Sequence, residues 1–198
     1  MAPDSGPTPD LSFVQDLPLT QAAIDYAQSR HGEQRRDADG APFLVHLLEV
    51  ASLLERSGYP DHVCAAAVLH DVLEDTDTAP SELRFRFGTD VCELVALVSD
   101  DPVIEDEDRR KEELLVRVYE AGGFAAAVYA ADKVSKVREL RIHIARGMGR
   151  EQSEVRLRRY RNSLVMLDEV LPESRLVEIL RFELEALEAL PPEPRAGD

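Results

Sequence analysis

The sequence DHVCAAAVLHDVLEDT, residues 61–76, decides the fold class. Pro60 and Asp61 begin it, and the run Val63 to Leu69 holds only small and apolar side chains. Such a run does not alternate between polar and apolar residues, and it is apolar around a whole helix. A helix of this kind belongs in a core, so we expect it to be buried by the rest of the chain.

The sequence on both sides has the same helical periodicity. Strand signals are almost absent, because the few β-branched residues fall at helical spacing. We predict an all-α bundle of about eight or nine helices, in one domain over residues 11–190 with loose tails at 1–10 and 191–198. The expected helices cover residues 20–31, 42–58, 61–76, 78–88, 89–98, 105–121, 124–146, 151–170 and 172–190.

The charge balance limits the possible partners. Asp and Glu number 39 against 23 Lys and Arg, a net charge of −16, which disfavours general binding to nucleic acid or to anionic membrane surfaces. The apolar runs are shorter than the roughly 18 residues that span a bilayer, and no signal-peptide pattern is present. Cys64 and Cys92 lie apart in apolar stretches, which is typical of reduced core thiols. We therefore expect a cytoplasmic protein that binds neither nucleic acid nor membrane.

Four polar side chains lie at the end of the helix expected at residues 61–76. At i,i+4 spacing on a continuous helix, Glu74 lies above His70 and Asp75 above Asp71. Buried carboxylates without a partner are costly, and a metal ion would be a natural partner for them. Taken alone, the pattern HDxxED is a weak signal, because the polar end of an ordinary amphipathic helix often produces it.

Two further polar residues interrupt apolar helices. His46 breaks FLVHLLEV, where a packed core histidine is the common alternative, and Asp132 breaks AAAVYAADKV. An aspartate in such a place needs an arginine, a helix end or a metal. With His70 and Asp71 these residues make a mixed nitrogen and oxygen set, which suits Mn²⁺, Fe²⁺, Zn²⁺ or Mg²⁺.

The order H…HD…D is the signature of the HD superfamily of metal-dependent phosphohydrolases. Three segments resemble the (p)ppGpp hydrolase domain of the RelA/SpoT homologue family, and its small single-domain hydrolases are the best match in length. They are HGEQRRDADGAPFLVH (31–46), AAAVLHDVLEDTDTAPSELRFRFGTDVCELVALVSDD (65–101) and ADKVSKVREL (131–140). The resemblance covers about residues 21–140 and implies a compact HD-domain helical bundle.

The resemblance also implies a reaction and a site. Members of the family remove pyrophosphate from the 3′ position of guanosine tetra- or pentaphosphate, giving GDP or GTP. The ligands that it implies for one Mn²⁺ are His46, His70, Asp71 and Asp132. Glu74 and Asp75 fall on the pair that positions or deprotonates the attacking water. These roles agree with the chemistry, since a divalent ion makes water more acidic and a nearby carboxylate accepts its proton.

Cations for the substrate phosphates are expected before and after these ligands. The basic segment before His46 matches the one with which the family grips its substrate, although a solvated basic turn explains it as well. The residues after Asp132 are further candidates, or ordinary salt-bridge partners. The predicted substrate-binding residues are Arg30, His31, Arg35, Arg36, Lys133, Lys136 and Arg138. The stretch RLRRYR, residues 156–161, is expected to be a solvated face.

Several positions depart from the family pattern. Pro102 follows VSDD where the family usually has a lysine, and Ser135 and Lys136 replace a tyrosine and an asparagine. Arg30 also stands in place of a lysine. The hydrolytic residues are complete, which favours an enzyme, whereas the substrate-reading ones are altered, and there are two alternatives to the family's reaction. One is an HD phosphohydrolase for another phosphorylated nucleotide or metabolite, such as NADPH; the other is a non-enzymatic domain that senses a nucleotide or binds a protein.

Overall fold

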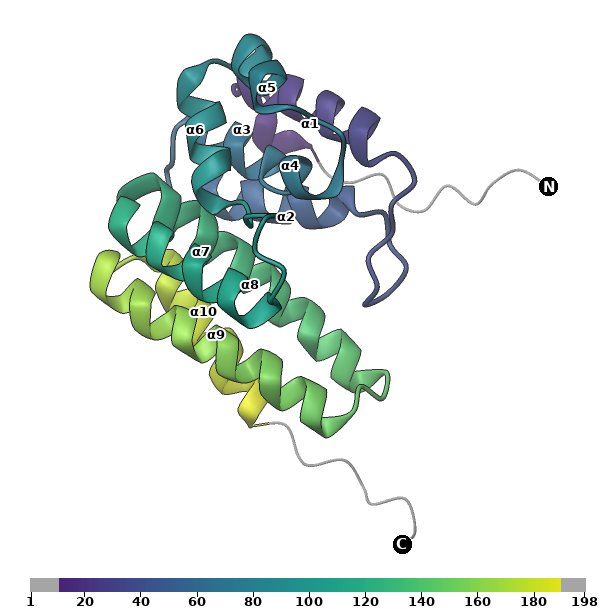
Figure 1. Cartoon of the computed structure of the whole chain (residues 1–198), viewed down its shortest axis with the longest axis vertical. Coiled ribbons are helices and arrows are strands. Elements are labelled where there is room, and N and C mark those ends of the chain that lie inside the picture. Colours follow the sequence, from purple (N-terminus) through teal and green to yellow (C-terminus); the bar gives the residue numbers. More distant parts are fainter. Residues whose placement is uncertain (1–10, 190–198) are drawn as a thin grey trace, which may run out of the picture.

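The computed structural model describes residues 11–189, and the regular elements in that range are all helical (Figure 1). The predicted all-α fold is confirmed, and each predicted helix is present, one of them split in two. The predicted tails lie outside the described residues. The elements are η1 (Ser12–Val14, a 3-10 turn), α1 (Pro18–His31), α2 (Leu44–Glu55), α3 (Asp61–Leu69), α4 (Val72–Asp75), α5 (Pro80–Phe87), α6 (Thr89–Val98), α7 (Glu107–Ala121), α8 (Gly123–Ala145), α9 (Arg150–Val170) and α10 (Arg175–Glu188).

The helix expected over residues 61–76 is not continuous, and that prediction is wrong. His70 Nδ1 hydrogen-bonds to the Ala67 carbonyl at 2.7 Å. The Ser99 hydroxyl shares its proton between the Val95 carbonyl at 2.8 Å and the His70 carbonyl at 3.2 Å. These side chains bind carbonyl groups that the next helical turn would use. The Glu74 amide donates instead to the Asp71 carbonyl, at 3.2 Å. His70 and Asp71 therefore stand at the joint between α3 and α4.

Helix α3 lies at the centre of the core, as its sequence predicts. Every residue from Val63 to Leu69 is completely buried, and α3 contacts α1, α2, α6 and α8. Its first residue also caps a neighbouring helix, because the Asp61 carboxylate accepts hydrogen bonds from the Leu19 and Thr20 amides, each at 2.9 Å. Capping a helix start with a carboxylate satisfies amides that have no partner within the helix.

Helix α8 joins the two halves of the molecule. Figure 1 shows α1 to α6 grouped at one end and α7 to α10 at the other, and α8 contacts helices of both groups. Residues 125–132 of α8 are all buried, and five of the eight are alanine, so neighbouring helices approach this part closely. This packing places the middle of α8 against α2 and the end of α3.

Both cysteines are buried and unpaired, as expected. Among the described residues, no helix is both long and apolar enough to cross a bilayer.

Candidate metal centre and adjoining pocket

Three buried positions bring two histidine side chains and one aspartate side chain together. His46 lies on α2, His70 directly follows α3, and Asp132 lies within α8; their ligand atoms are within 4.8 Å of one another. The Asp71 carboxylate adds one oxygen 3.3 Å from His70 Nε2 and another 3.6 Å from His46 Nε2. The four residues predicted as ligands are thus neighbours in the structure.

Hydrogen bonds behind each imidazole ring determine which nitrogen faces the cluster. His70 Nδ1 donates to the Ala67 carbonyl at 2.7 Å. His46 Nδ1 lies 2.9 Å from Ser135 Oγ, whose single proton is donated to the Glu49 carboxylate at 2.6 Å. The serine oxygen therefore accepts from His46. Both neutral rings then carry a lone pair on Nε2, and these two atoms face each other at 3.3 Å.

The Asp132 carboxylate divides its two oxygens between different partners. Lys133 Nζ donates to Oδ2 at 2.6 Å. Oδ1 lies 3.4 Å from His46 Nε2 and 3.5 Å from His70 Nε2, and it is buried without a hydrogen-bond partner. Burial alone would raise the pKa of Asp132, but Lys133 and the two rings outweigh burial and hold that pKa well below its usual range. Asp132 is therefore ionised and has one oxygen free.

This donor set fits a divalent metal ion. Two imidazole lone pairs and a carboxylate oxygen repel one another unless a positive charge lies between them. Their separations of 3.3 to 3.5 Å match nitrogen and oxygen ligands around one ion with bonds of about 2.1 Å. The cluster also attracts a proton: burial lowers the pKa of His70, but Asp71 and Asp132 overcome burial and raise it to about 9.

The two predicted catalytic carboxylates lie on α4, directly after the ligands. Glu74 Oε1 accepts a hydrogen bond from the Asp100 amide at 2.6 Å, which holds it toward the loop after α6. Burial raises the pKa of Glu74 to about 7, and the Asp71 charge acts in the same direction. Burial, followed by Asp71, also raises the pKa of Asp75. Carboxylates with raised pKa values are suited to accepting protons near neutral pH.

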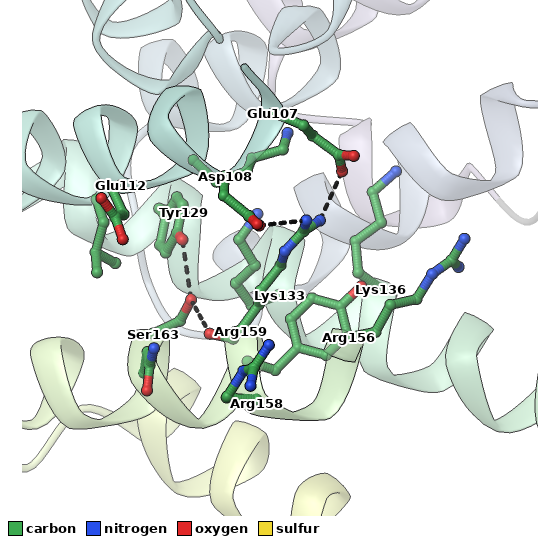
Figure 2. Close-up of a pocket in the computed structure, with 14 residues that line it drawn as sticks. Glu107, Asp108, Glu112, Tyr129, Lys133, Lys136, Arg156, Arg158, Arg159 and Ser163 are labelled. Atoms are coloured by element: carbon green, nitrogen blue, oxygen red, sulfur yellow. Dashed lines mark hydrogen bonds and ion pairs between the residues drawn. The ribbon is translucent and has the colours of Figure 1, made fainter. Parts of the chain in front are cut away.

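A pocket of about 470 Å³ adjoins the cluster between α7, α8 and α9 (Figure 2). Lys133 and Lys136 line it from α8, and Lys133 also contacts Asp132, so the pocket and the cluster share a wall. Arg159 reaches across from α9 to Glu107 and Asp108 at the start of α7, at 2.6 and 2.7 Å. The further lining residues include the basic and aromatic side chains Lys111, Tyr129, Arg156, Arg158 and Tyr160.

The basic residues predicted before His46 have different partners in the structure. Arg30 is tied to α5 and the loop before it, through Glu82 at 2.6 Å and Asp77 at 3.3 Å. Arg36 pairs with Asp39 and lies 3.7 Å from Glu139.

The other two members of that segment differ in burial. Arg35 is exposed, whereas His31 is buried with Nε2 lacking a hydrogen-bond partner. His31 also stacks near Phe43, with ring centroids 4.9 Å apart, and Phe43 in turn lies 5.6 Å from His46. Of the segment, His31 is the member connected to the cluster through packed rings.

The three predicted cations on α8 have different surroundings. Lys133 neutralises Asp132 and lies 4.2 Å from the centre of the Tyr129 ring. Lys136 lies 5.7 Å from the centre of the Phe43 ring and faces the pocket. Burial lowers the pKa of Lys136, but Asp71 and Asp132 outweigh burial and raise it, which shows that this ammonium lies in the field of the cluster.

Arg138 is directed away from the pocket. It donates to Glu49 and to Glu183, each at 2.7 Å. The salt-bridge alternative considered for Arg138 from the sequence is therefore what the structure contains.

Sequence reasoning missed several residues around the site. Arg156 and Tyr160 line the pocket, although their stretch was expected to be a solvated face. Their i,i+4 spacing, which places both on one side of α9, was the available signal. Glu49 and Ser135 support His46, but neither carries a pattern that identifies this role. Their contact depends on how α2 packs against α8.

Known proteins resemble this chain in sequence and in fold. Residues 23–118 match the HD domain family. The guanosine-3′,5′-bis(diphosphate) 3′-pyrophosphohydrolase MESH1 of Drosophila melanogaster is 32% identical over 134 residues, 66% of this chain and 74% of that protein. The human MESH1 protein is 37% identical over 121 residues, 60% of this chain and 67% of that protein.

Solved structures agree with the sequence comparison. One, described as a metazoan ortholog of SpoT that hydrolyzes ppGpp and plays a role in starvation responses, has a TM-score of 0.76 and 25% identity. The match covers 94% of this chain and all of that one. A second, lmo0812 from Listeria monocytogenes, has a TM-score of 0.66 at 21% identity over 75% of this chain and 98% of that one, and it shows the shared fold.

The helical bundle and its buried His-His-Asp cluster define an HD-domain protein. The cluster draws on α2, the end of α3 and α8, which contact one another in the core, so the fold and the site support the same assignment. Within that class, the chain belongs to the family of MESH1-type guanosine-3′,5′-bis(diphosphate) 3′-pyrophosphohydrolases.

Proposed function

We propose that this protein hydrolyses guanosine 3′,5′-bis(diphosphate), and the corresponding pentaphosphate, to GDP or GTP and pyrophosphate. The observation that carries the proposal is the unpartnered Asp132 oxygen between two imidazole lone pairs, in a chain 32% identical to a MESH1 protein over 74% of its length. The substrate is a small nucleotide rather than a nucleic acid, and the protein acts in the cytoplasm.

The proposed ligands are His46, His70, Asp71 and Asp132, and the proposed metal is Mn²⁺, with Mg²⁺, Fe²⁺ or Zn²⁺ as substitutes. Such an ion makes water more acidic and offsets charge that develops on phosphoryl oxygens. The residues around it perform the remaining tasks. Lys133 takes up one oxygen of Asp132, which leaves the other oxygen directed at the cluster.

Glu74 and Asp75 are proposed to orient the attacking water and accept its proton. Both side chains reach solvent, and the pKa of each is raised, that of Glu74 to about 7. They follow Asp71 by three and four residues on α4, and they are proposed to act beside the ligands rather than as ligands. A carboxylate with a pKa near 7 is a better proton acceptor at neutral pH than an ordinary one.

The pocket between α7, α8 and α9 is proposed to hold the nucleotide. Its lysines and arginines offset phosphate charge, and the partly exposed Tyr160 offers a flat surface for a base. Lys136 is the proposed link, because it faces the pocket while lying in the field of the Asp71 and Asp132 carboxylates. His31 and Arg35 are proposed as further phosphate contacts. Arg30, Arg36 and Arg138 already have carboxylate partners and are proposed to act only after exchanging them.

The test is hydrolysis of ppGpp by purified protein loaded with Mn²⁺, with GDP and pyrophosphate measured as products. Asp71→Ala and Glu74→Ala should abolish the activity. Equal activity in wild type and in Asp132→Ala would identify a contaminating enzyme and favour a non-enzymatic domain. No turnover of ppGpp by metal-loaded protein would overturn the proposal.

A second candidate is hydrolysis of another phosphorylated nucleotide or metabolite. The observation that favours it is Lys136, which adds a positive charge where the family has an asparagine, together with Pro102 in place of a lysine. A panel of phosphorylated compounds that includes NADPH, assayed by released phosphate or pyrophosphate, separates the two candidates. Turnover of ppGpp alone would eliminate the second.

A further inference from the structure

We propose that Glu49 and Ser135 are positioning residues, which hold His46 in the orientation and tautomer that bind the metal. The inference rests on the proposed metal site and extends it beyond the ligands themselves. It also includes α10, because Glu183 on that helix is linked to Glu49 through Arg138.

The direction of each hydrogen bond follows from the number of protons available. The Glu49 carboxylate is a pure acceptor, so the bond of 2.6 Å between Glu49 Oε2 and Ser135 Oγ uses the serine proton. The serine oxygen, 2.9 Å from His46 Nδ1, can then only accept. His46 therefore carries its proton on Nδ1 and its lone pair on Nε2, the atom that faces the cluster.

The chain of hydrogen bonds continues to the last helix. Arg138 Nη1 donates to Glu49 Oε1 at 2.7 Å, and Arg138 Nε donates to Glu183 Oε1 at 2.7 Å. Arg141 holds the other oxygen of Glu183 at 2.5 Å. Glu183 is buried on α10, which makes it an unusual position for a carboxylate without a specific role. The support of His46 thus extends from α2 through α8 to α10.

The second histidine of the cluster is held in a different way. His70 Nδ1 donates to a backbone carbonyl of its own helix, which no side-chain substitution removes. His46 depends instead on two side chains from two other positions. Hydrogen bonds to the distal nitrogen of a ligating histidine fix its orientation and strengthen it as a donor, and losing such a partner costs about 10- to 100-fold in metal affinity.

One nearby group can partly replace Ser135. Glu139 Oε1 is buried without a hydrogen-bond partner and lies 3.5 Å from His46 Nδ1. In a Ser135→Ala protein, this carboxylate is the fallback acceptor. The effect of Ser135→Ala should therefore be larger in a Glu139→Gln background.

The experiment measures Mn²⁺ affinity by titration calorimetry. Ser135→Ala and Glu49→Ala should each weaken Mn²⁺ binding about 10-fold or more. The double variant should lose little beyond the larger single loss, because both residues act through one hydrogen-bonded chain. Ser135→Thr, which keeps the hydroxyl, should restore binding, and Glu183→Gln should cause a smaller loss. Glu178→Gln, at an exposed position of α10, is the matched control.

A second measurement does not require metal or activity. Nitrogen-15 spectra of the metal-free protein report which ring nitrogen of His46 carries the proton, and wild type should show it on Nδ1 whenever the ring is neutral. If the wild-type protein does not bind Mn²⁺ but carries the His46 proton on Nδ1, the proposed metal site is wrong and the positioning of His46 by Ser135 still stands. The inference would be overturned if Ser135→Ala kept Mn²⁺ affinity within twofold of its parent, both with Glu139 intact and in the Glu139→Gln background. Additive losses in the double variant would overturn it as well.

Discussion

The cluster and the pocket share a wall, yet they are built in opposite ways. His46, His70 and Asp132 are buried among packed helices, and hydrogen bonds fix the two imidazole rings from behind. The pocket is lined by long, charged side chains, several of them held by exposed ion pairs. Close packing restricts substitution in the first region, whereas flexible surface side chains permit it in the second. The residues proposed for hydrolysis are therefore fixed by the core, whereas those proposed to bind the substrate can change without disturbing it.

The strongest test of this contrast removes one charge from the cluster. Asp132→Asn keeps the shape of the side chain but removes the negative charge of the carboxylate. Turnover should therefore fall by about 1,000-fold or more. Steady-state hydrolysis and Mn²⁺ titration measure the loss, and thermal melting checks that Lys133, now without an anionic partner, has not unfolded the protein. Asp168→Asn, in an exposed ion pair with Arg181, is the control and should have no effect. Residual activity above a tenth would contradict the assigned role of Asp132.

The pH dependence of metal binding gives the next largest effect. His70 must be neutral to bind a metal, and its pKa in the metal-free protein is raised to about 9. Below that pH each bound ion must displace a proton, so the affinity for Mn²⁺ should fall about tenfold per pH unit as the pH drops. Calorimetry at pH 6 to 8, in buffers of different ionisation enthalpy, measures both affinity and proton release. A constant affinity with no proton released would refute the prediction.

The sequence predicts these two regions unequally, for a physical reason. The ligands interrupt apolar helices, so His46 and Asp132 are visible as exceptions to a strong periodic pattern. The joint at His70 is not visible, because it depends in part on Ser99, which directly follows α6. The pocket is also hidden, since Arg156 and Tyr160 read as an ordinary basic helix surface until α9 is placed beside α7 and α8. Local patterns predict burial, but they do not predict which helices meet.

A substitution in the pocket should separate substrate affinity from chemistry. Lys136→Asn removes a positive charge beside the cluster, so KM for a phosphorylated substrate should rise about tenfold, about 1.4 kcal/mol, while kcat changes little. Lys136→Arg, which keeps the charge, is the control and should stay within a few-fold of wild type. A large fall in kcat with unchanged KM would assign Lys136 to the chemistry instead.

The smallest effect is expected at the rim of the pocket. Arg159 is about one-third exposed, and its partners Glu107 and Asp108 are mostly exposed. Exposed ion pairs contribute roughly 0 to 1 kcal/mol, so Arg159→Ala should change the free energy of unfolding by less than about 1 kcal/mol. Urea denaturation measures it. A loss of several kcal/mol would show that the contact between α7 and α9 is essential to the fold. The pocket would then tolerate substitution no better than the cluster does.

The acidic surface has a kinetic consequence for substrate capture. From Asp61 to Asp108 the chain carries fourteen acidic residues and two arginines, and the protein as a whole has a net charge of −16. An approaching nucleotide polyphosphate is repelled at long range and attracted only near the lysines and arginines of the pocket. At physiological ionic strength the screening length is about 8 Å, so salt removes the distant repulsion before it weakens contacts inside the pocket. Encounter with substrate should therefore become faster as salt is first added, the reverse of the behaviour of a basic enzyme with an anionic ligand.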